Sequence, residues 1–355
     1  MLHGLPSFSE SGVAAAACIA AGIVLGGAAA AQPTQAPLTQ VAIGIANTAT
    51  DVGFFIADKR GYFRDVGIAV TMTPFASAAR MIAPLGTGQL DVGAGTVAAG
   101  LYNAVDRGIR MRIVADKGSV ASGYEYSTLL IRRDLVDSGR YKTLADLKGL
   151  TIAAAAQGSG SESSLNEALK KGGLKFTDVN VVYMGFPEQL AAYRNKGIDG
   201  SVTAEPTVTR TIREGYAVRA SPQAIYPGQQ TAVVLFSESF ANRRALAQKF
   251  MNAYIHAVRD YNDALMDGRI AGPGAREIIA ILTEYTEIKN AETFATMTAF
   301  AVNPDGRVNA ASLRNDLDFF RQRALVAGKV SVDQVIDNSF AEEAVRALGA
   351  YKGRR

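Results

Sequence analysis

The sequence predicts an α/β protein built from mainly parallel sheets with helices on both faces. Strands and helices alternate along most of the chain, which is the order that builds parallel sheets. The alternation restarts near residue 141 without a long linker, so we expect a second βα series after the first. With 355 residues, of which 48% are hydrophobic and 20% charged, the chain has the composition of a globular protein with a buried core.

The first series occupies the N-terminal third of the chain. Its short apolar runs are typical of strands, and the segments between them have apolar residues at helical spacing. We predict strands at 40–46, 68–75, 90–95 and 109–116, and helices at 53–63, 76–89 and 97–108.

The second series follows an apolar segment at 127–135. It begins with "YKTLADLKGLTIAAAA" (141–156) and continues through "VNVVYMGFPEQLAAYRNKGID" (179–199) and "GSVTAEP" (200–206). A strand over 231–240 then leads back out of this series, and the chain from residue 241 on is predicted to be nearly all helix.

The N-terminus has the features of an export signal. An apolar run over 14–25 is followed by small residues, and Ala29-x-Ala31 fits the cleavage rule, so we expect residues 1–31 to be a signal peptide and the mature chain to lie in the periplasm. Cys18, the one cysteine, falls inside this segment. The mature chain would therefore have no disulfide, no thiolate metal site and no cysteine nucleophile.

Several catalytic chemistries lack their residues. His256 is the one histidine after residue 31, and it lies in a segment with the apolar spacing of an ordinary amphipathic helix. The sequence contains neither H-E-x-x-H nor G-x-S-x-G, so we expect no metal site and no serine triad. The net charge of +4 is scattered rather than clustered, which argues against a nucleic-acid partner.

One glycine pattern allows two interpretations. Gly93-x-Gly95-x-x-Ala98 is a permitted dinucleotide fingerprint, and Asp116 ends a strand about twenty residues further on. The apolar stretch before it is short, however, and a nicotinamide cofactor is not expected outside the cytoplasm. The alternative is a strand-to-helix turn in which glycine allows close backbone approach. We therefore expect no cofactor.

A second glycine-rich stretch follows the strand at the start of the second series. "AAAAQGSGSESSLNEALKKGG" (153–173) matches neither the P-loop nor the dinucleotide pattern. Ser159 with Glu162, and Ser164 with Glu167, have capping-box spacing, so a helix is predicted to start here. Its free N–H groups and serine hydroxyls suit a small anionic or polar group. No base or metal accompanies them, so the loop would hold a ligand without transforming it. The alternative is a plain strand-to-helix connection.

Five stretches follow one another in a characteristic order: "DVGFFIADKRGYFRDVGIAV", "GTGQLDVGAG", "TLADLKGLTIA", "GIDGSVTAEP" and "VSVDQVIDNSFAEEAV". With them the chain resembles the type II periplasmic substrate-binding proteins of ABC transporters, in the sulfonate, nitrate and taurine group that also includes thiamine-pyrimidine binders. The resemblance covers about residues 40–345. It does not extend to the thiamine-pyrimidine synthases of the same fold, because these carry a cysteine-rich iron motif and the mature chain has no cysteine.

The resemblance implies two α/β lobes joined by two crossing strands, with the ligand between the lobes. We expect one lobe at 32–128 plus 232–355 and the other at 129–231. It also implies delivery of the ligand to a membrane permease driven by an ATPase, and we expect the binding protein to be a monomer.

The site residues follow from the rule that ligands bind beyond the carboxyl ends of parallel strands. Phe54 is predicted either to stack on a flat ligand or to belong to the core. Glu205 is predicted to bind a ligand cation or hold the closed cleft together, or else to cap its own turn. Tyr124 and Tyr126 could line the hinge, and Arg80 is the nearest arginine for a charged ligand. The predicted ligand contacts are Asn47, Thr48, Phe54, Ser77, Ala78, Gly95, Thr96, Gln157, Gly158, Ser159, Gly160, Ser161, Thr203 and Glu205.

The sequence thus predicts an extracytoplasmic protein that captures a small anionic or polar solute, such as a sulfonate or carboxylate, by closing two lobes around it. A neutral heterocycle remains an alternative ligand, because no arginine is clearly placed at a strand end. Two other functions remain as alternatives: a ligand-sensing subunit of a membrane receptor, and an enzyme on the same fold.

Overall fold

The computed structural model describes residues 37–75 and 77–353. The predicted signal peptide, residues 1–31, lies outside the described residues. The described residues belong to one compact unit. No helix in the described part of the chain has the length and apolar character needed to span a membrane.

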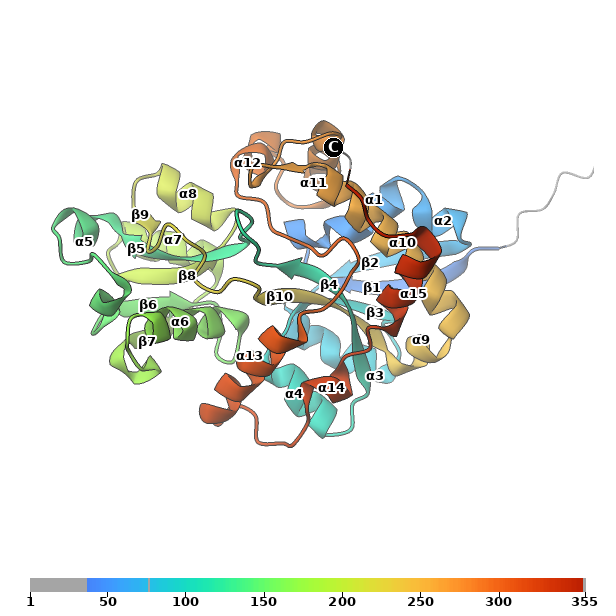
Figure 1. Ribbon diagram of the computed structural model, residues 1–355, viewed down its shortest axis with the longest axis horizontal. Coiled ribbons are helices and arrows are strands. Elements are labelled where there is room, and N and C mark those ends of the chain that lie inside the picture. Colours follow the sequence, from blue (N-terminus) through green and yellow to red (C-terminus); the bar gives the residue numbers. More distant parts are fainter. Residues whose placement is uncertain (1–36, 76, 354–355) are drawn as a thin grey trace, which may run out of the picture. The chain divides into compact units, whose positions relative to one another are not determined.

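The first sheet has five strands in the order β2-β1-β3-β10-β4 (Figure 1). Strand β1 pairs in parallel with β2 and β3, whereas β10 runs antiparallel between β3 and β4. The sheet is therefore mixed, with four strands in one direction, as predicted for a mainly parallel sheet. Its strands are β1 (Thr39–Ile45), β2 (Ile68–Pro74), β3 (Val92–Thr96), β4 (Met111–Ser119) and β10 (Gln230–Ser237).

The second sheet repeats this plan in the order β7-β6-β8-β5-β9. Strand β6 is parallel to β7 and β8, and β5 runs antiparallel between β8 and β9. The strands are β5 (Ser127–Arg132), β6 (Thr151–Ala154), β7 (Asn180–Tyr183), β8 (Gly200–Ala204) and β9 (Ala217–Arg219). We call each sheet with its flanking helices a lobe. The lobe bounds expected from the sequence remain a prediction.

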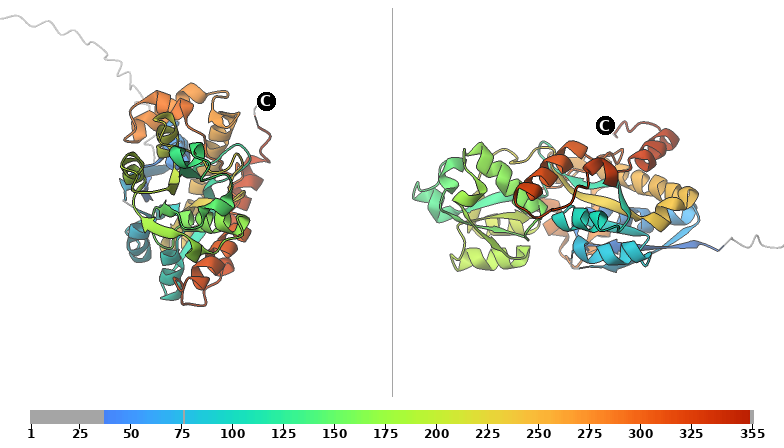
Figure 2. Two further views of the ribbon diagram at one scale, coloured as in Figure 1. Left: turned by 90° about the vertical axis from the view of Figure 1, so that its left-hand side faces the viewer. Right: turned by 90° about the horizontal axis from the view of Figure 1, so that it is seen from below.

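Helices cover both faces of the first sheet (Figure 2). Helix α10 packs along α1 and α15, and Gly53 lets it approach α1 closely, since a Cβ there would lie 2.6 Å from the Tyr254 ring. The helices are α1 (Val52–Lys59), α2 (Tyr62–Asp65), α3 (Ile82–Thr87), α4 (Ala99–Asp106), α9 (Glu238–Asn242), α10 (Arg244–Asp263), α11 (Ala275–Tyr285), α12 (Ala291–Thr296), α13 (Ala310–Gln322), α14 (Val332–Val335) and α15 (Ser339–Leu348).

The second sheet also separates two apolar cores. Leu129 and Ile131 of β5 point into the core on the α6 side, and Leu130 between them points into the opposite core. This is the period-two alternation of a strand buried on both faces. The helices of this lobe are α5 (Arg133–Asp137), α6 (Gly160–Lys171), α7 (Phe186–Arg194) and α8 (Thr207–Arg213).

The chain after residue 241 was predicted to be nearly all helix, and two of its non-helical parts bear on the site. A short hairpin pairs β11 (Leu265–Met266) with β12 (Arg269–Ile270). Asp267 and Gly268 both have positive φ at its turn, and Asp-Gly is a strong hairpin signal that the sequence analysis missed. The second exception is the irregular segment 297–303, which we call the strap.

Candidate functional site

The chain passes twice between the two sheets, at 120–126 and at 220–229 (Figure 1). The two crossings pair with each other: Val120 N–H donates to Gln229 O at 3.0 Å, and Gly228 N–H donates to Val120 O at 2.8 Å. The strap runs beside the first crossing, because Ser119 and Ala301 exchange backbone hydrogen bonds and Glu125 N–H donates to Ala299 O at 3.0 Å. Two chain segments therefore connect the lobes, and the strap lies beside them.

Asp116 fastens these segments together. Its buried carboxylate accepts hydrogen bonds from Gly118 N–H (2.7 Å), Ser119 Oγ (3.0 Å), Gln230 Nε2 (2.6 Å) and Asn303 N–H (2.7 Å). Burial raises the pKa of Asp116 to about 6 although these donors favour the charged form. With four donors and 1% exposure, Asp116 is not available to a ribose as the dinucleotide interpretation requires.

The glycines of that pattern have a packing role. A Cβ on Gly93 would lie 2.7 Å from Leu85 Cδ1, and one on Gly95 would collide with Ala78 Cβ. Both positions thus need glycine so that the segment before and within α3 can lie on β3. Of the predicted contacts near this point, Ser77 and Thr96 are exposed, whereas Gly95 is buried under Ala78. Arg80 is exposed.

The loop at 157–161 lies against the first lobe. Ala99 N–H donates to Gly158 O at 2.9 Å, and Ala98 forms an isolated antiparallel bridge with Ser159. Gln229 of the second crossing donates from Nε2 to Gly160 O at 2.9 Å. The loop therefore stands where the two lobes meet, at the carboxyl end of β6.

The helix start itself differs from the expected capping box. The Ser159 side chain makes no cap hydrogen bond, and the buried Glu162 carboxylate accepts from Gly158 N–H at 2.7 Å. Gly158 has a φ of 67°, so its N–H is turned toward the first turn of α6 by a conformation that favours glycine. Ser164, in the second expected box, lies inside α6 and donates to Gln229 Oε1 at 2.7 Å.

The first lobe contributes a polar floor after β1. Asn47 and Thr48 are half-buried there, and the Thr48 and Thr50 hydroxyls are 2.9 Å apart. Beneath them Lys117 Nζ lies 2.8 Å from Asp51 Oδ1 and donates to Thr50 Oγ1 at 2.7 Å. The Lys117 and Asp51 side chains are 1% and 0% exposed. Sequence reasoning missed this pair, although a lysine after the apolar run of β4 was a signal for it.

Tyr126 lies near this floor at the end of the first crossing. Burial raises its pKa to about 12, and the negative charges of Asp51 and Glu205 act in the same direction. Its ring meets Phe300 edge-on, with the centroids 6.3 Å apart. Tyr126 is thus fixed between the crossing and the strap, and its hydroxyl stays protonated at neutral pH.

Phe54 does not line a groove. Its side chain is fully buried, and its ring packs against Tyr254 (centroids 4.9 Å apart) and Phe250 (6.2 Å). Both neighbours lie on α10, so the core interpretation of Phe54 holds and stacking on a ligand is wrong for this structure. The helical apolar spacing of α10 was visible in the sequence, but the sequence did not indicate that α10 packs against Phe54.

A hollow of about 280 Å³ opens beside the carboxyl end of β1. Asn47 is the one predicted contact that lines it. The remaining lining side chains come from β1, β2, α1 and α11, at the outer edge of the first sheet: Ile45, Phe55, Asp58, Val70, Met72, Pro74 and Tyr285.

Two predicted site residues lie at the carboxyl end of strand β8: Thr203 within the strand and Glu205 directly after it. Thr203 is fully buried on the same face of β8 as Ser201, whose hydroxyl lies 3.0 Å from Tyr193 Oη, so Thr203 faces the interior of the second lobe. Glu205 accepts from Thr209 N–H (3.0 Å), from Thr209 Oγ1 (2.9 Å) and from Thr298 N–H (3.1 Å). Glu205 therefore both caps its own turn and holds the strap, and burial raises its pKa.

A second contact between the lobes runs along α6 and α13. Arg323 Nη1 lies 3.1 Å from Glu162 Oε1, and Asn315 Nδ2 donates to Glu167 Oε1 at 3.1 Å. Tyr226 of the second crossing donates to Asp316 Oδ1 at 3.0 Å. Burial raises the pKa of Asp316 to about 7. No sequence pattern pointed to this cluster, because its members lie up to 161 residues apart.

The chain matches the NMT1-like family over residues 34–270. It belongs to the NMT1-like family. It is 27% identical over 202 residues to a Brachyspira hyodysenteriae protein named as an ABC transporter periplasmic binding protein, and 24% identical over 209 residues to an Escherichia coli protein named as an aliphatic sulfonates-binding protein.

These alignments are partial. They cover 54% and 57% of this chain, and 56% and 61% of those two relatives. Among solved structures, the periplasmic aliphatic sulphonate binding protein of Escherichia coli is similar, with a TM-score of 0.67 and 21% identity over 84% of this chain and 92% of that one. The NMT1-like chain thus has the two-lobed fold of periplasmic binding proteins that its sequence predicted.

Proposed function

We propose that this NMT1-like protein captures a small anionic or polar solute between its two lobes and delivers it to an ABC permease with its ATPase. The observation that carries the proposal is the position of the 157–161 loop, which follows a strand of one lobe and contacts the first turn of α4 in the other. Ligands of open α/β sheets bind at such strand ends. The names of the relatives support the same role.

The proposed ligand contacts are polar residues that follow strand ends in the two lobes. They are Asn47, Thr48, Ser77, Thr96, Gln157, Ser159 and Ser161. The protein acts by closing rather than by catalysis: contacts that a solute makes better in the closed form shift the population toward it. We place the mature protein in the periplasm as a monomer that releases its solute unchanged.

The experiment is a thermal-shift screen of the chain from residue 32 on, against sulfonates, carboxylates, amides and amines. A solute present at 100 times its Kd stabilises the folded state by about 2.7 kcal/mol, so a true ligand gives a saturable rise in Tm. Mass spectrometry of the mixture after incubation checks that the solute is unaltered. A chemically changed solute, or no saturable rise with any class, would contradict the proposal.

A double variant tests the loop. Ser159→Ala with Ser161→Ala removes hydroxyls at the junction and is expected to weaken binding of the best solute by about 0.5–3 kcal/mol. The Tm without solute is expected to fall as well, because the two hydroxyls also bond Ala156 O and Ala155 N–H, so the affinity is compared at a temperature where both proteins are folded. Ser138→Ala is the matched control, because Ser138 directly follows α5 and donates to Leu135 O at 3.3 Å, at the far end of the second lobe. Unchanged affinity in the double variant would remove the loop from the site.

A further inference from the structure

The serine hydroxyls of the 157–161 loop direct their protons into the loop. Ser159 Oγ donates to Ala156 O at 2.6 Å, and the Ser159 and Ser161 oxygens are 2.8 Å apart. A hydroxyl has one proton, so Ser161 must be the donor in that pair. Ser161 Oγ in turn accepts from Ala155 N–H at 3.0 Å. Both hydroxyls therefore have lone pairs left to offer and no proton.

A carboxylate of the protein already accepts the hydrogen bond of one backbone N–H in the loop. Glu162, with 0% exposure, accepts from Gly158 N–H and from the Tyr183 hydroxyl, and pairs with Arg323. The negative charge thus stands in the first turn of α6, where a bound anion would be stabilised by the helix. The first turn also abuts the first lobe through the Ala98–Ser159 bridge. The Gly158 N–H and the Arg323 guanidinium are thus both already bound to Glu162, and neither is free for an incoming anion.

The balance of charged groups at the junction of the lobes also disfavours an anionic solute. Three carboxylates have cationic partners: Asp51 with Lys117, Glu125 with Arg219, and Glu162 with Arg323. Glu205, Asp116 and Asp316 are also buried at the junction, and none of them has an ion pair in the part of the chain that the structure describes. The junction described above therefore has more carboxylates than cations, and its three cations are already paired, so an anionic solute would find no unpaired cation among these groups.

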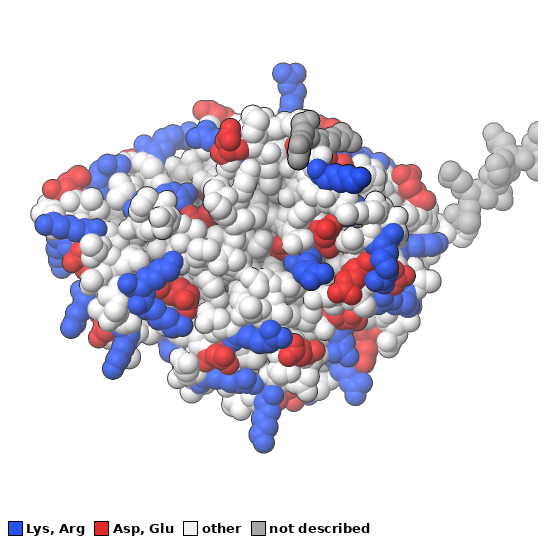
Figure 3. Space-filling model, viewed as in Figure 1, with Lys and Arg blue, Asp and Glu red and all other residues white. Residues whose placement is uncertain are grey.

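We propose, on the basis of the proposed function, that the solute carries hydrogen-bond donors and no net negative charge. Its class is a neutral amide-like molecule or an amine-type cation, whose N–H groups would meet the Ser159 and Ser161 lone pairs. Glu162 sets this preference because its carboxylate already accepts the Gly158 N–H, the loop donor that is turned toward the start of α6. In Figure 3 the surface over the crossings is mostly uncharged, whereas charges of both signs lie over the two lobes.

The test uses ethanesulfonate, nitrate and benzoate as anionic probes, and benzamide and benzamidine as a neutral and a cationic probe. In the chain from residue 32 on, the anions are expected to give no saturable rise in Tm beyond sodium chloride of equal ionic strength. A saturable rise with any of the three overturns the inference and leaves the proposed function standing. If the neutral and cationic compounds of the wider screen also give no rise, the proposed function fails and the inference falls with it.

Glu162→Gln sharpens the result. It removes the negative charge while keeping a hydrogen-bonding side chain, and is expected to raise the affinity for ethanesulfonate or nitrate about tenfold. Glu188→Gln is the matched control. Glu188 lies on α7 of the same lobe, outside the junction contacts described above, so this variant should change the affinity for neither ethanesulfonate nor nitrate. Anion affinity that is equal in wild type and Glu162→Gln would count against the role of Glu162. Should Glu162→Gln fail to fold, Glu205→Gln tests the same charge balance, and the wild-type result still decides the inference.

Discussion

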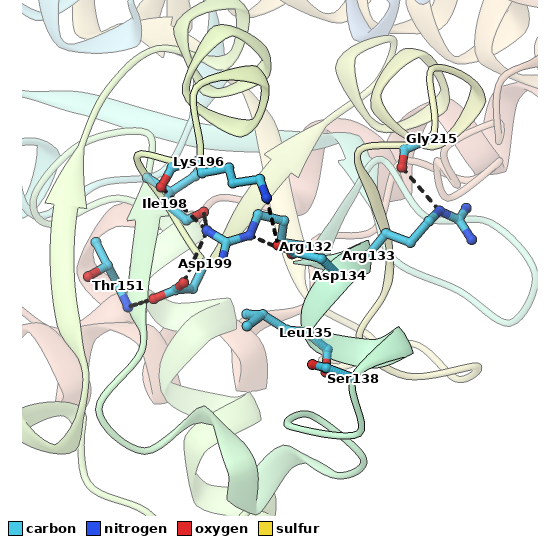
Figure 4. A network of polar contacts seen from close by, with 10 residues as sticks. All are labelled: Arg132, Arg133, Asp134, Leu135, Ser138, Thr151, Lys196, Ile198, Asp199 and Gly215. Atoms are coloured by element: carbon cyan, nitrogen blue, oxygen red, sulfur yellow. Dashed lines mark hydrogen bonds and ion pairs between the residues drawn. The ribbon is translucent and has the colours of Figure 1, made fainter.

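Charged side chains gather at both ends of the strands of the second sheet. We call these two ends the far edge and the junction edge, and their charged groups have different roles. At the edge away from the first lobe, Arg132 donates to Asp134 at 2.6 Å and lies 3.3 Å from Asp199, which accepts from Thr151 N–H at 3.0 Å (Figure 4). Lys196 completes this network with an ion pair to Asp134 at 3.3 Å. Every partner belongs to the second lobe.

At the opposite edge the partners come from elsewhere in the chain. Glu162 pairs with Arg323, Glu205 accepts from Thr298, and Gly158 O accepts from Ala99. The far edge therefore fixes strand ends within one lobe, and the junction edge couples the two lobes. Substitutions at the far edge should change stability alone, whereas those at the junction should also change ligand affinity.

The largest effect is expected from Lys117→Met. Removing the ammonium leaves Asp51 buried without its ion-pair partner, so we expect the free energy of unfolding to fall by about 3–5 kcal/mol. Urea denaturation followed by circular dichroism measures it. A loss below about 1 kcal/mol would show that Asp51 is hydrated or protonated in the folded protein.

A pH effect comes next in size. The pKa of Asp316 is about 7 in the folded protein, above its ordinary 3.8, so its contribution to stability is fully present below pH 3.8 and is lost as pH rises to 7. The loss is on the order of 2 kcal/mol between pH 5 and 7, because one pKa unit is worth about 1.4 kcal/mol. Asp316→Asn should reduce this slope in urea titrations, since Asn cannot ionise, and the part that remains is expected from Asp116, whose pKa is raised to about 6. Parallel pH profiles for the two proteins would refute the assignment.

Two glycines separate backbone strain from the lobe contact. Gly158 and Gly173 both have positive φ, at 67° and 71°, but a Cβ on Gly158 would lie 2.9 Å from Ala99 Cβ and one on Gly173 would meet nothing within 4 Å. We expect either substitution to alanine to cost about 1 kcal/mol of stability. Only Gly158→Ala should also lower the affinity for the solute found in the thermal-shift screen, and calorimetry measures that affinity. Equal binding by both variants would argue against a role for the Gly158–Ala99 contact in closure.

The smallest effect is expected at the far edge. The Lys196 side chain is 70% exposed and its pair with Asp134 is open to solvent. Lys196→Met should change the free energy of unfolding by less than about 0.5 kcal/mol and leave solute affinity unchanged. The same urea and calorimetric measurements apply, and a change in affinity would break the distinction between the two edges.

Local patterns were enough to predict most elements and the position of the loop. The apolar run before Gln157 and the Gly-Ser stretch after it predicted a strand followed by a helix, and strand-end geometry placed the loop toward the first lobe. What Glu162 does was not predictable. Its spacing from Ser159 is that of a capping box, but its partners Tyr183 and Arg323 are 21 and 161 residues away.

The same limit explains the errors in the first lobe. Phe54 looked equally suited to a ligand or a core because periodicity marks a buried face without naming its neighbour. Lys117 and Asp51 lie in segments that are unremarkable when taken separately, and only the sheet brings them together. Contacts between distant segments, which form the junction, are the information that one sequence does not carry.

The strap gives a direct way to watch the lobes move. Since Ala301 is bonded to Ser119 and Thr298 N–H to Glu205, any rotation of one lobe must either carry the strap along or detach it. The one cysteine of the sequence lies at position 18, so a chain expressed from residue 32 has no native thiol. A single cysteine introduced at Thr298 would therefore accept a fluorophore without background, and its emission would report solute capture as it happens.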